Sequence, residues 1–368
     1  MRIVVIGGTG NFGARICRAL ADDPSLEIVA CSRHAADRLS YPVDSTAIRS
    51  AQLDIETEDF AQQLRALAPH IVIHCAGPFQ GQNYRVAEAT IDAGSHYIDI
   101  ADGRDFVCNF GSSLNARATN AGFLAVSGAS SVPALSSAVV DHLARDLRSL
   151  HSIDICIAPA QQAPRGAATI AGVFSYAGRP FEWLVDSRWQ TAYGWQELAT
   201  IEFRSLGSRR AAACDVPDLE LFPDRYRGVH TVRFRAALEL AIEHHALWIS
   251  AALRRIGIPL PIEHWASPLD KLATRLNRLG SQRGGMLVSV SGEDRNGARV
   301  RFNWELTADD NHGPEIPCMP AILLARKIAS GAISTRGARP CMGLLTLDEF
   351  ATEFARWGIT STISTIAI

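Results

Sequence analysis

The chain has 368 residues, of which 47% are hydrophobic and 20% are charged, and its formal net charge is −2. This length suggests two domains, and the composition is that of a globular protein rather than a disordered one. The near-neutral charge excludes a general attraction to nucleic acid. Only Lys271 and Lys327 among the 36 basic residues are lysines, which excludes most chemistry that needs an amine.

The eight cysteines are scattered along the chain and form no Cys-x-x-Cys pair. We therefore expect reduced thiols in the core of a cytoplasmic protein, and no metal site. Met1 and Arg2 lead directly into a short apolar run, so we expect no signal peptide. No uncharged apolar run is long enough for a transmembrane segment.

Residues 1–150 are predicted to form a doubly wound α/β domain with a parallel sheet. Short β-branched runs alternate with amphipathic segments, which is typical of a parallel sheet with helices on both faces. A longer helix is expected over residues 131–147, with Pro133 in its first turn. The predicted strands are 3–6, 28–31, 51–53, 71–75, 97–100 and 123–126, and the predicted helices are 12–20, 60–67, 83–93 and 114–120.

Residues 151–312 are predicted to form a second domain of the α+β class. A strand is expected at 153–158, and two further strands, 286–291 and 300–307, flank Asn296-Gly297, a strong hairpin signal that indicates an antiparallel sheet. A strongly apolar helix is expected at 236–256, and another helix at 320–329 within the remaining segment, 313–368.

Residues 225–301 carry 13 basic and 6 acidic side chains. A solvated basic face explains this surplus, and a surface for an anionic substrate or for membrane headgroups remains the alternative. For the helix at 236–256 we favour a buried position in the core over association with a membrane.

A glycine-rich loop follows the first predicted strand and opens the first predicted helix. Gly7 permits a tight turn, Gly10 lets backbone N–H groups approach a diphosphate, and Gly13 lets the helix pack closely on the strand. The helix N-terminus adds a positive dipole end. This strand–loop–helix context indicates a dinucleotide-binding domain. The expected cofactor contacts in the loop are Gly7, Thr9, Gly10, Asn11, Phe12 and Gly13.

The end of the second strand favours NADP over NAD. An NAD-binding domain normally carries Asp or Glu there for the ribose 2′-hydroxyl, whereas this chain has Ser32-Arg33, followed by His34 and Arg38. An arginine forms charge-assisted hydrogen bonds with a 2′-phosphate, which a carboxylate would repel. The alternative is that Arg33 is a solvent-facing loop residue.

Three further loops are expected along the cofactor, because ligands of such sheets bind beyond the carboxyl ends of the strands. Asp54 and Ile55 after the third strand are placed to line the adenine. The glycine–proline turn after the fourth strand fits this crevice, although it is also readable as an ordinary turn, and the sixth strand ends before Gly128. The residues of the fourth loop are Cys75, Ala76, Gly77 and Pro78.

Several enzyme classes lack their signatures in this sequence. A Tyr-x-x-x-Lys pair is absent, since none of the six tyrosines has a lysine four residues on. The nucleophile elbow Gly-x-Ser-x-Gly, the zinc motif His-Glu-x-x-His and the phosphate-loop Gly-Lys-Ser/Thr are absent as well. A hydrolase or an NTPase would have to be built without its usual motif.

Four motifs in this order resemble the saccharopine dehydrogenase-like (saccharopine reductase-type) oxidoreductases over about residues 1–145. They are the loop 7–13, Ile73-His-Cys-Ala-Gly-Pro-Phe79, Tyr97-Ile-Asp-Ile-Ala-Asp102 and Ser127-Gly-Ala-Ser-Ser-Val-Pro133. The stretch 286–304 with Gly313-Pro-Glu-Ile-Pro317 is similar to an uncharacterised bacterial branch of that group. The resemblance implies an NADP-binding Rossmann domain, an inserted α+β domain for substrate binding or dimerisation, and a segment 313–368 that packs back on the first domain.

The resemblance also implies hydride transfer between NADPH and a C=N, C–N or C=O bond of a small amino-acid-like substrate. Catalytic candidates after the fifth strand are Tyr97, Asp99 and Asp102, which could relay a proton or bind a substrate ammonium group. Asp99 is equally readable as a loop residue bonded to backbone, and Tyr97 as a packing residue. A non-catalytic dinucleotide sensor or scaffold, and a reductase of a lipid-like substrate, remain alternatives. We expect a homodimer.

Overall fold

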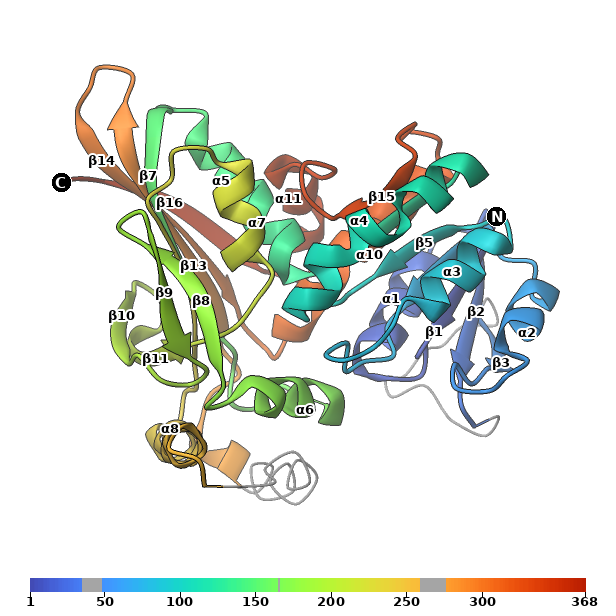
Figure 1. Cartoon of the computed structure of the whole chain (residues 1–368), viewed down its shortest axis with the longest axis horizontal. Helices are drawn as coiled ribbons and strands as arrows, with labels where there is room; N and C mark the ends of the chain where they lie inside the picture. Colours follow the sequence, from blue (N-terminus) through green and yellow to red (C-terminus); the bar gives the residue numbers. More distant parts are fainter. Residues whose placement is uncertain (35–47, 165, 259–275) are drawn as a thin grey trace. The chain divides into compact units, whose positions relative to one another are not determined.

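The computed structural model describes residues 1–34, 48–164, 166–258 and 276–368. The chain divides into two compact units, which Figure 1 shows coloured along the sequence. Unit 1 comprises residues 1–135 and 314–345, and unit 2 comprises residues 136–313 and 346–368. Each unit is built around its own sheet.

Unit 1 contains a parallel sheet of seven strands within the described residues, in the order β15-β6-β5-β4-β1-β2-β3. The first six strands along the chain confirm the predicted ones, and the order reverses between β1 and β4, where ligands of such sheets bind. The strands are β1 (Arg2–Ile6), β2 (Glu27–Ser32), β3 (Ile48–Gln52), β4 (Ile71–His74), β5 (His96–Asp99), β6 (Leu124–Ser127) and β15 (Gly337–Pro340).

The helices of unit 1 follow the predicted pattern, with one extension. The predicted helix at 114–120 is only the end of an 18-residue helix, α4. Phe106, Phe110, Leu114 and Ala118 recur every four residues on its buried side, which is the spacing of one helix face. The helices are α1 (Asn11–Ala21), α2 (Phe60–Ala66), α3 (Arg85–Asp92), α4 (Arg104–Ala121) and α10 (Met319–Ala329).

The segment after residue 313 is shared between the units rather than packing as one piece on the first. Its first part supplies α10 and β15, which pairs with β6, and Glu315 lies 3.0 Å from Arg15 Nε and 3.1 Å from Arg18 Nη2 of α1. Its second part supplies α11 (Leu347–Arg356) and β16 (Thr360–Ala367). Because β16 pairs with β14, this part belongs to unit 2.

Unit 2 contains a mixed sheet of nine strands within the described residues. Most neighbours are antiparallel, but β12 runs parallel to β7. The predicted hairpin is confirmed, since β13 and β14 pair around Gly297, whose φ is 85°. The strands are β7 (Leu147–Ala158), β8 (Pro180–Val185), β9 (Arg188–Tyr193), β10 (Ala199–Phe203), β11 (Gly207–Ala213), β12 (Thr231–Ala237), β13 (Gly284–Asp294), β14 (Arg299–Ala308) and β16.

Two predicted helices have different bounds. The helix expected at 131–147 begins at Ser136 as α5 (Ser136–Ala144), because Val132 precedes a proline and is extended at φ −128°, a conformation that a following proline favours. The helix expected at 236–256 begins at Ala241 as α8 (Ala241–Arg255), since the preceding residues form β12. The other helices of unit 2 are α6 (Ala167–Tyr176), α7 (Asp218–Arg225) and α11.

The boundary between the units differs from the predicted one at residue 150. Residue 135 closes the first part of unit 1, and α5 belongs to unit 2. The reason is packing, because α5 lies against β7 and β13 of the second sheet. All eight cysteines are free, and six of them are buried, which agrees with the expected reduced thiols.

Candidate functional site

The turn between β1 and α1 depends on two of its glycines. Gly7 has a φ of 76°, a conformation that side chains rarely adopt. A Cβ on Gly13 would lie 2.2 Å from the carbonyl oxygen of Gly7. The helix therefore packs as closely on the turn as the sequence predicts.

The start of α1 is suited to an anion. Its N-cap residue is the exposed Gly10, which offers no side-chain cap, and the first turn carries no acidic residue. The N-terminal N–H groups of a helix point along its axis and favour negative charge. Thr9, Asn11 and Phe12 are half-buried around this end. The residues thus fit the diphosphate of a dinucleotide.

The end of β2 presents an arginine on a fixed backbone. The carbonyl oxygen of Arg33 accepts a hydrogen bond from Gln52 Nε2 at 3.0 Å, and Ser32 Oγ donates to the carbonyl of His34 at 2.8 Å. The Arg33 side chain is exposed, and none of these three residues carries a carboxylate. This end of the strand therefore fits a 2′-phosphate. Arg38 lies outside the described residues.

Asp54, after β3, holds its own turn. Its Oδ1 accepts a hydrogen bond from the N–H of Glu56 at 3.0 Å, and its carbonyl accepts one from Thr57 Oγ1 at 3.1 Å. Asp54 and Ile55 are both half-buried. Contact of these two residues with the adenine stays a prediction.

The loop after β4 lies against the glycine turn. A Cβ on Gly7 would be 3.0 Å from backbone atoms of Cys75 and Ala76. Gln82 Nε2 braces the loop by donating to the carbonyls of Ala76 at 2.9 Å and Pro78 at 2.7 Å. Gly77 is half-buried and Pro78 is exposed. Two of the predicted cofactor loops are therefore brought together.

Asp99, at the end of β5, is completely buried. Its Oδ1 accepts hydrogen bonds from the N–H of Gly128 at 2.8 Å, the N–H of Ala101 at 3.0 Å and Ser127 Oγ at 3.0 Å. Burial raises its pKa to about 6 against the lowering effect of these donors. The carboxylate thus fixes the loop that leaves β6.

Tyr97 and His74 form a buried pair beside this carboxylate. The Tyr97 hydroxyl lies 3.1 Å from His74 Nδ1, and the Tyr97 ring stacks on Phe110 at 5.7 Å between centroids. Burial lowers the pKa of His74 to about 4 and raises the pKa of Tyr97 well above its usual value. Both groups are therefore neutral near neutral pH.

His74 is the residue of this site that the sequence analysis missed. The signal that could have identified it is the position of a histidine inside the apolar run 71–75. Within the described residues, His74 Nε2 and Asp99 Oδ2 have no hydrogen-bond partner.

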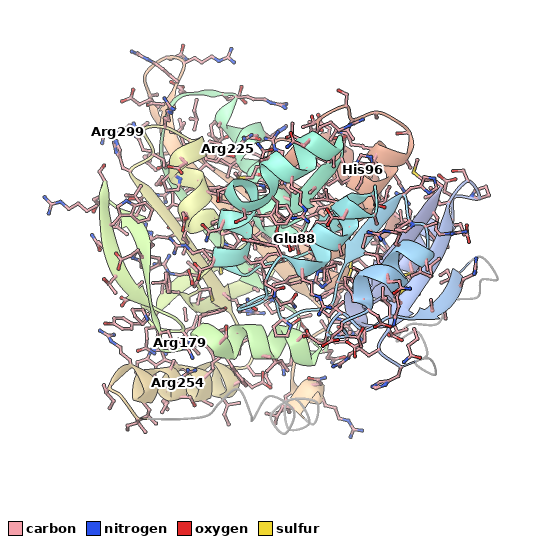
Figure 2. The ribbon with its side chains drawn as sticks, turned by 45° about the vertical axis from the view of Figure 1, so that its right-hand side comes forward. Glu88, His96, Arg179, Arg225, Arg254 and Arg299 are labelled. Atoms are coloured by element: carbon pink, nitrogen blue, oxygen red, sulfur yellow. The ribbon has the colours of Figure 1, made fainter. Side chains whose placement is uncertain are left out.

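The first residues of β5 and β6 are also linked by a side chain. His96 Nδ1, on a residue labelled in Figure 2, accepts a hydrogen bond from the N–H of Leu124 at 3.0 Å.

The three catalytic candidates lie in different environments. Asp102 is exposed, and its Oδ1 accepts a hydrogen bond from Gln80 Nε2 at 3.2 Å. Tyr97 and Asp99 have no exposed surface, so the expectation that they touch a substrate is not supported. Their environment matches the alternative interpretations, packing for Tyr97 and loop anchoring for Asp99.

Residues 3–126 match the family described as the saccharopine dehydrogenase NADP binding domain. The chain therefore carries a saccharopine dehydrogenase-like NADP-binding domain. The match ends with β6 and so covers the glycine turn, the arginine after β2 and the loops after β4 and β5. A nicotinamide dinucleotide is the cofactor of this domain.

Solved structures with the fold of this chain share little of its sequence. The apo histidine-tagged saccharopine dehydrogenase (L-Glu forming) from Saccharomyces cerevisiae is 12% identical, with a TM-score of 0.68 and coverage of 100% of both chains. The homospermidine synthase from Legionella pneumophila, solved with NAD, is 10% identical, with a TM-score of 0.61 and coverage of 100% of this chain and 91% of that chain. Among curated proteins, no sequence matches.

Within residues 1–34, 48–164, 166–258 and 276–368, no group of three or more His, Cys, Asp or Glu side chains is arranged to hold a metal ion. No helix in those same ranges is both long and apolar enough to cross a membrane.

Proposed function

We propose that this protein is an NADP-dependent oxidoreductase that transfers hydride between NADPH and a C=N, C–N or C=O bond. The observation that carries the proposal is the glycine turn at the switch point of the sheet, where an uncapped helix end lies beside the loop after β4. NADPH supplies the hydride, and the protein holds the cofactor and the substrate carbon together while excluding water.

Arg33 selects the cofactor. Its exposed guanidinium, on a backbone held by Gln52, pairs with the 2′-phosphate through charge-assisted hydrogen bonds. NADH lacks this phosphate, so we expect it to bind more weakly.

Asp99 and Tyr97 act as positioning residues. Asp99 holds the loop at Gly128 in place, and that loop is proposed to border the nicotinamide. Tyr97 in turn fixes His74 within the sheet. Asp102, the exposed member of the set, is proposed to bind an ammonium group of the substrate.

The substrate is proposed to be a small amino-acid-like molecule. The yeast structure with this fold is described as forming L-glutamate, and the Legionella structure is a homospermidine synthase. An amine-bearing substrate suits the exposed carboxylate of Asp102, because a cation gains from a nearby negative charge.

The test is turnover of NADPH or NADP with a panel of amino acids, paired keto acids and amines, and aldehydes. We expect oxidation or reduction of the cofactor with at least one amine-bearing member, and a weaker rate with NADH or NAD. Cofactor binding without turnover across the whole panel would contradict the proposal and favour a dinucleotide sensor.

A further inference from the structure

Helix α8 of unit 2 is labelled in Figure 1, and few of its side chains are buried. The side chains that it buries are those of His244 and Ala251. Within the described residues, neither ring nitrogen of His244 has a hydrogen-bond partner, and burial lowers its pKa to about 4. The ring packs edge-on against Trp195 at 5.5 Å between centroids. The expectation that this helix is a buried core element is therefore wrong.

The apolar side of α8 faces outward. Ile242 is 68% exposed, Ile249 is 50% exposed, and Ile256, just after the helix, is 73% exposed. These residues are seven apart and so share one side of the helix. Exposing three large aliphatic side chains on one stripe costs stability unless another apolar phase covers it.

Two further exposed aliphatic side chains lie outside the helix. Ile258 is 42% exposed, and Leu279, at the end of the short helix η3 (Asn277–Leu279), is 71% exposed. Gln161 Nε2 ties η3 to α8, because it donates to Glu243 Oε1 at 2.8 Å and to Asn277 Oδ1 at 3.5 Å. We call the surface formed by Ile242, Ile249, Ile256, Ile258 and Leu279 the α8 patch.

Arginines border the α8 patch. Arg255 and Arg278 are exposed, and Arg254, labelled in Figure 2, donates from Nη1 to the carbonyl of Phe174 at 2.8 Å. The Arg255 guanidinium lies 4.1 Å from the centroid of the Tyr193 ring. The border at this end of the patch is therefore cationic.

The carboxylates near the patch are bonded to neighbouring groups. Glu239 accepts hydrogen bonds from the backbone N–H groups of Gln161 and Ser281, each at 3.0 Å. Glu243 accepts one from the Gln161 side chain. These donors hold both carboxylates toward Gln161 and Ser281, whereas Arg255 and Arg278 are exposed.

We propose that unit 2 docks on an anionic phospholipid surface through the α8 patch. Aliphatic side chains of a helix with an arginine border enter the boundary between headgroups and acyl chains, while the arginines pair with phosphate. The chemistry does not fit a second copy as well. Ile258 and Leu279 lie off the stripe that a helix–helix pair would bury, and two copies would bring like-charged arginines together. This inference does not rest on the proposed function.

The test is sedimentation of the full chain with lipid vesicles. We expect binding to vesicles of equal parts phosphatidylglycerol and phosphatidylcholine, and much weaker binding to phosphatidylcholine alone. Ile249→Glu should weaken binding about tenfold or more, and Arg278→Gln about fivefold. The matched control is Ile366→Glu on β16, whose native side chain is 45% exposed and lies outside the patch, so its binding should equal that of the wild type.

Several results would overturn the inference. These are no sedimentation with either vesicle, equal binding by Ile249→Glu and the wild type, or an equal loss in Ile366→Glu. Sedimentation velocity without lipid detects the competing occupant, since a dimer that Ile249→Glu dissociates would assign the patch to a second copy. Thermal unfolding checks each variant, and Ile256→Glu replaces Ile249→Glu if the latter is unfolded.

Discussion

The glycine turn after β1 and the cluster at the end of β5 lie at the same edge of one parallel sheet, yet they use polar groups in opposite ways. The turn leaves a helix end without a side-chain cap and exposes Gly10 at that end. The cluster places a carboxylate, a phenol and an imidazole where they have almost no exposed surface. We therefore propose that backbone groups bind the ligand at this edge, while the buried side chains hold the loops that carry them.

The comparison separates polar residues that can contact a ligand from polar residues that hold loops in place. From the sequence alone, any carboxylate at a strand end could be a catalytic acid, but its burial in the fold decides whether it can reach a substrate. Asp99 and Asp102 are three residues apart, and only Asp102 is exposed.

Gly13→Ala should destabilise unit 1 by about 3 kcal/mol or more, because its Cβ would meet the Gly7 carbonyl oxygen at 2.2 Å. Gly10→Ala is the matched control, since its Cβ meets nothing closer than 3.2 Å. That variant should keep its stability and bind NADPH more weakly. Urea unfolding and cofactor titration measure both, and equal stabilities of the two variants would break the account of the turn.

Asp99→Asn should change how stability depends on pH. The native pKa of Asp99 is raised from 3.8 to about 6, so the native state keeps a proton that the unfolded state loses. Its contribution to the unfolding free energy is therefore largest below the unfolded pKa and is lost as the pH rises through about 6. The loss is about 3 kcal/mol for this fully buried group.

Asparagine does not titrate, so Asp99→Asn should remove this fall in stability between about pH 4 and pH 7. The measurement is urea unfolding at both pH values for the wild type and the variant. Asp105→Asn, at an exposed position in the first turn of α4, is the control and should follow the wild type. A variant Asp99→Asn with the wild-type pH profile would show that the carboxylate is not held as described.

Arg33→Asp should weaken NADPH binding about 100-fold, because an attractive pair with the 2′-phosphate becomes a repulsive one. NADH binding should change by less than about threefold. Fluorescence titration of both cofactors checks this. Equal losses for the two would mean that Arg33 does not contact the 2′-phosphate.

Asp102→Asn should lower turnover about tenfold with an amine-bearing substrate, mainly through the Michaelis constant, while the stability stays within about 0.5 kcal/mol of the wild type. Steady-state kinetics with the best substrate of the panel measures this. Unchanged kinetics would remove the exposed carboxylate from the site.

The local parts of this structure were predictable, because their signals are local. β1, β2 and β4 carry buried β-branched runs, Gly7 and Gly13 are required sterically in the glycine turn, and the Asn296-Gly297 hairpin has a backbone preference. β15 was not predictable, since Gly337-Ala-Arg-Pro340 has no strand pattern and pairs only because it lies beside β6.

The candidate site was predictable as a set of loops but not as a set of contacts. Whether Tyr97 faces a substrate or packs on Phe110 depends on how α4 packs on the sheet, which the local sequence pattern does not show. The sequence likewise could not show that the apolar stripe of α8 faces outward. Hydrophobic spacing tells which side of a helix is apolar, but not which side packs on the rest of the protein.

Calorimetry of the full chain with NADPH and NADH decides whether the chain binds a nicotinamide dinucleotide and whether Arg33 selects between the two. NADPH should bind with an affinity at least about tenfold higher than NADH, because only NADPH offers Arg33 a phosphate. Absence of binding by both cofactors, or tighter binding of NADH, would contradict it.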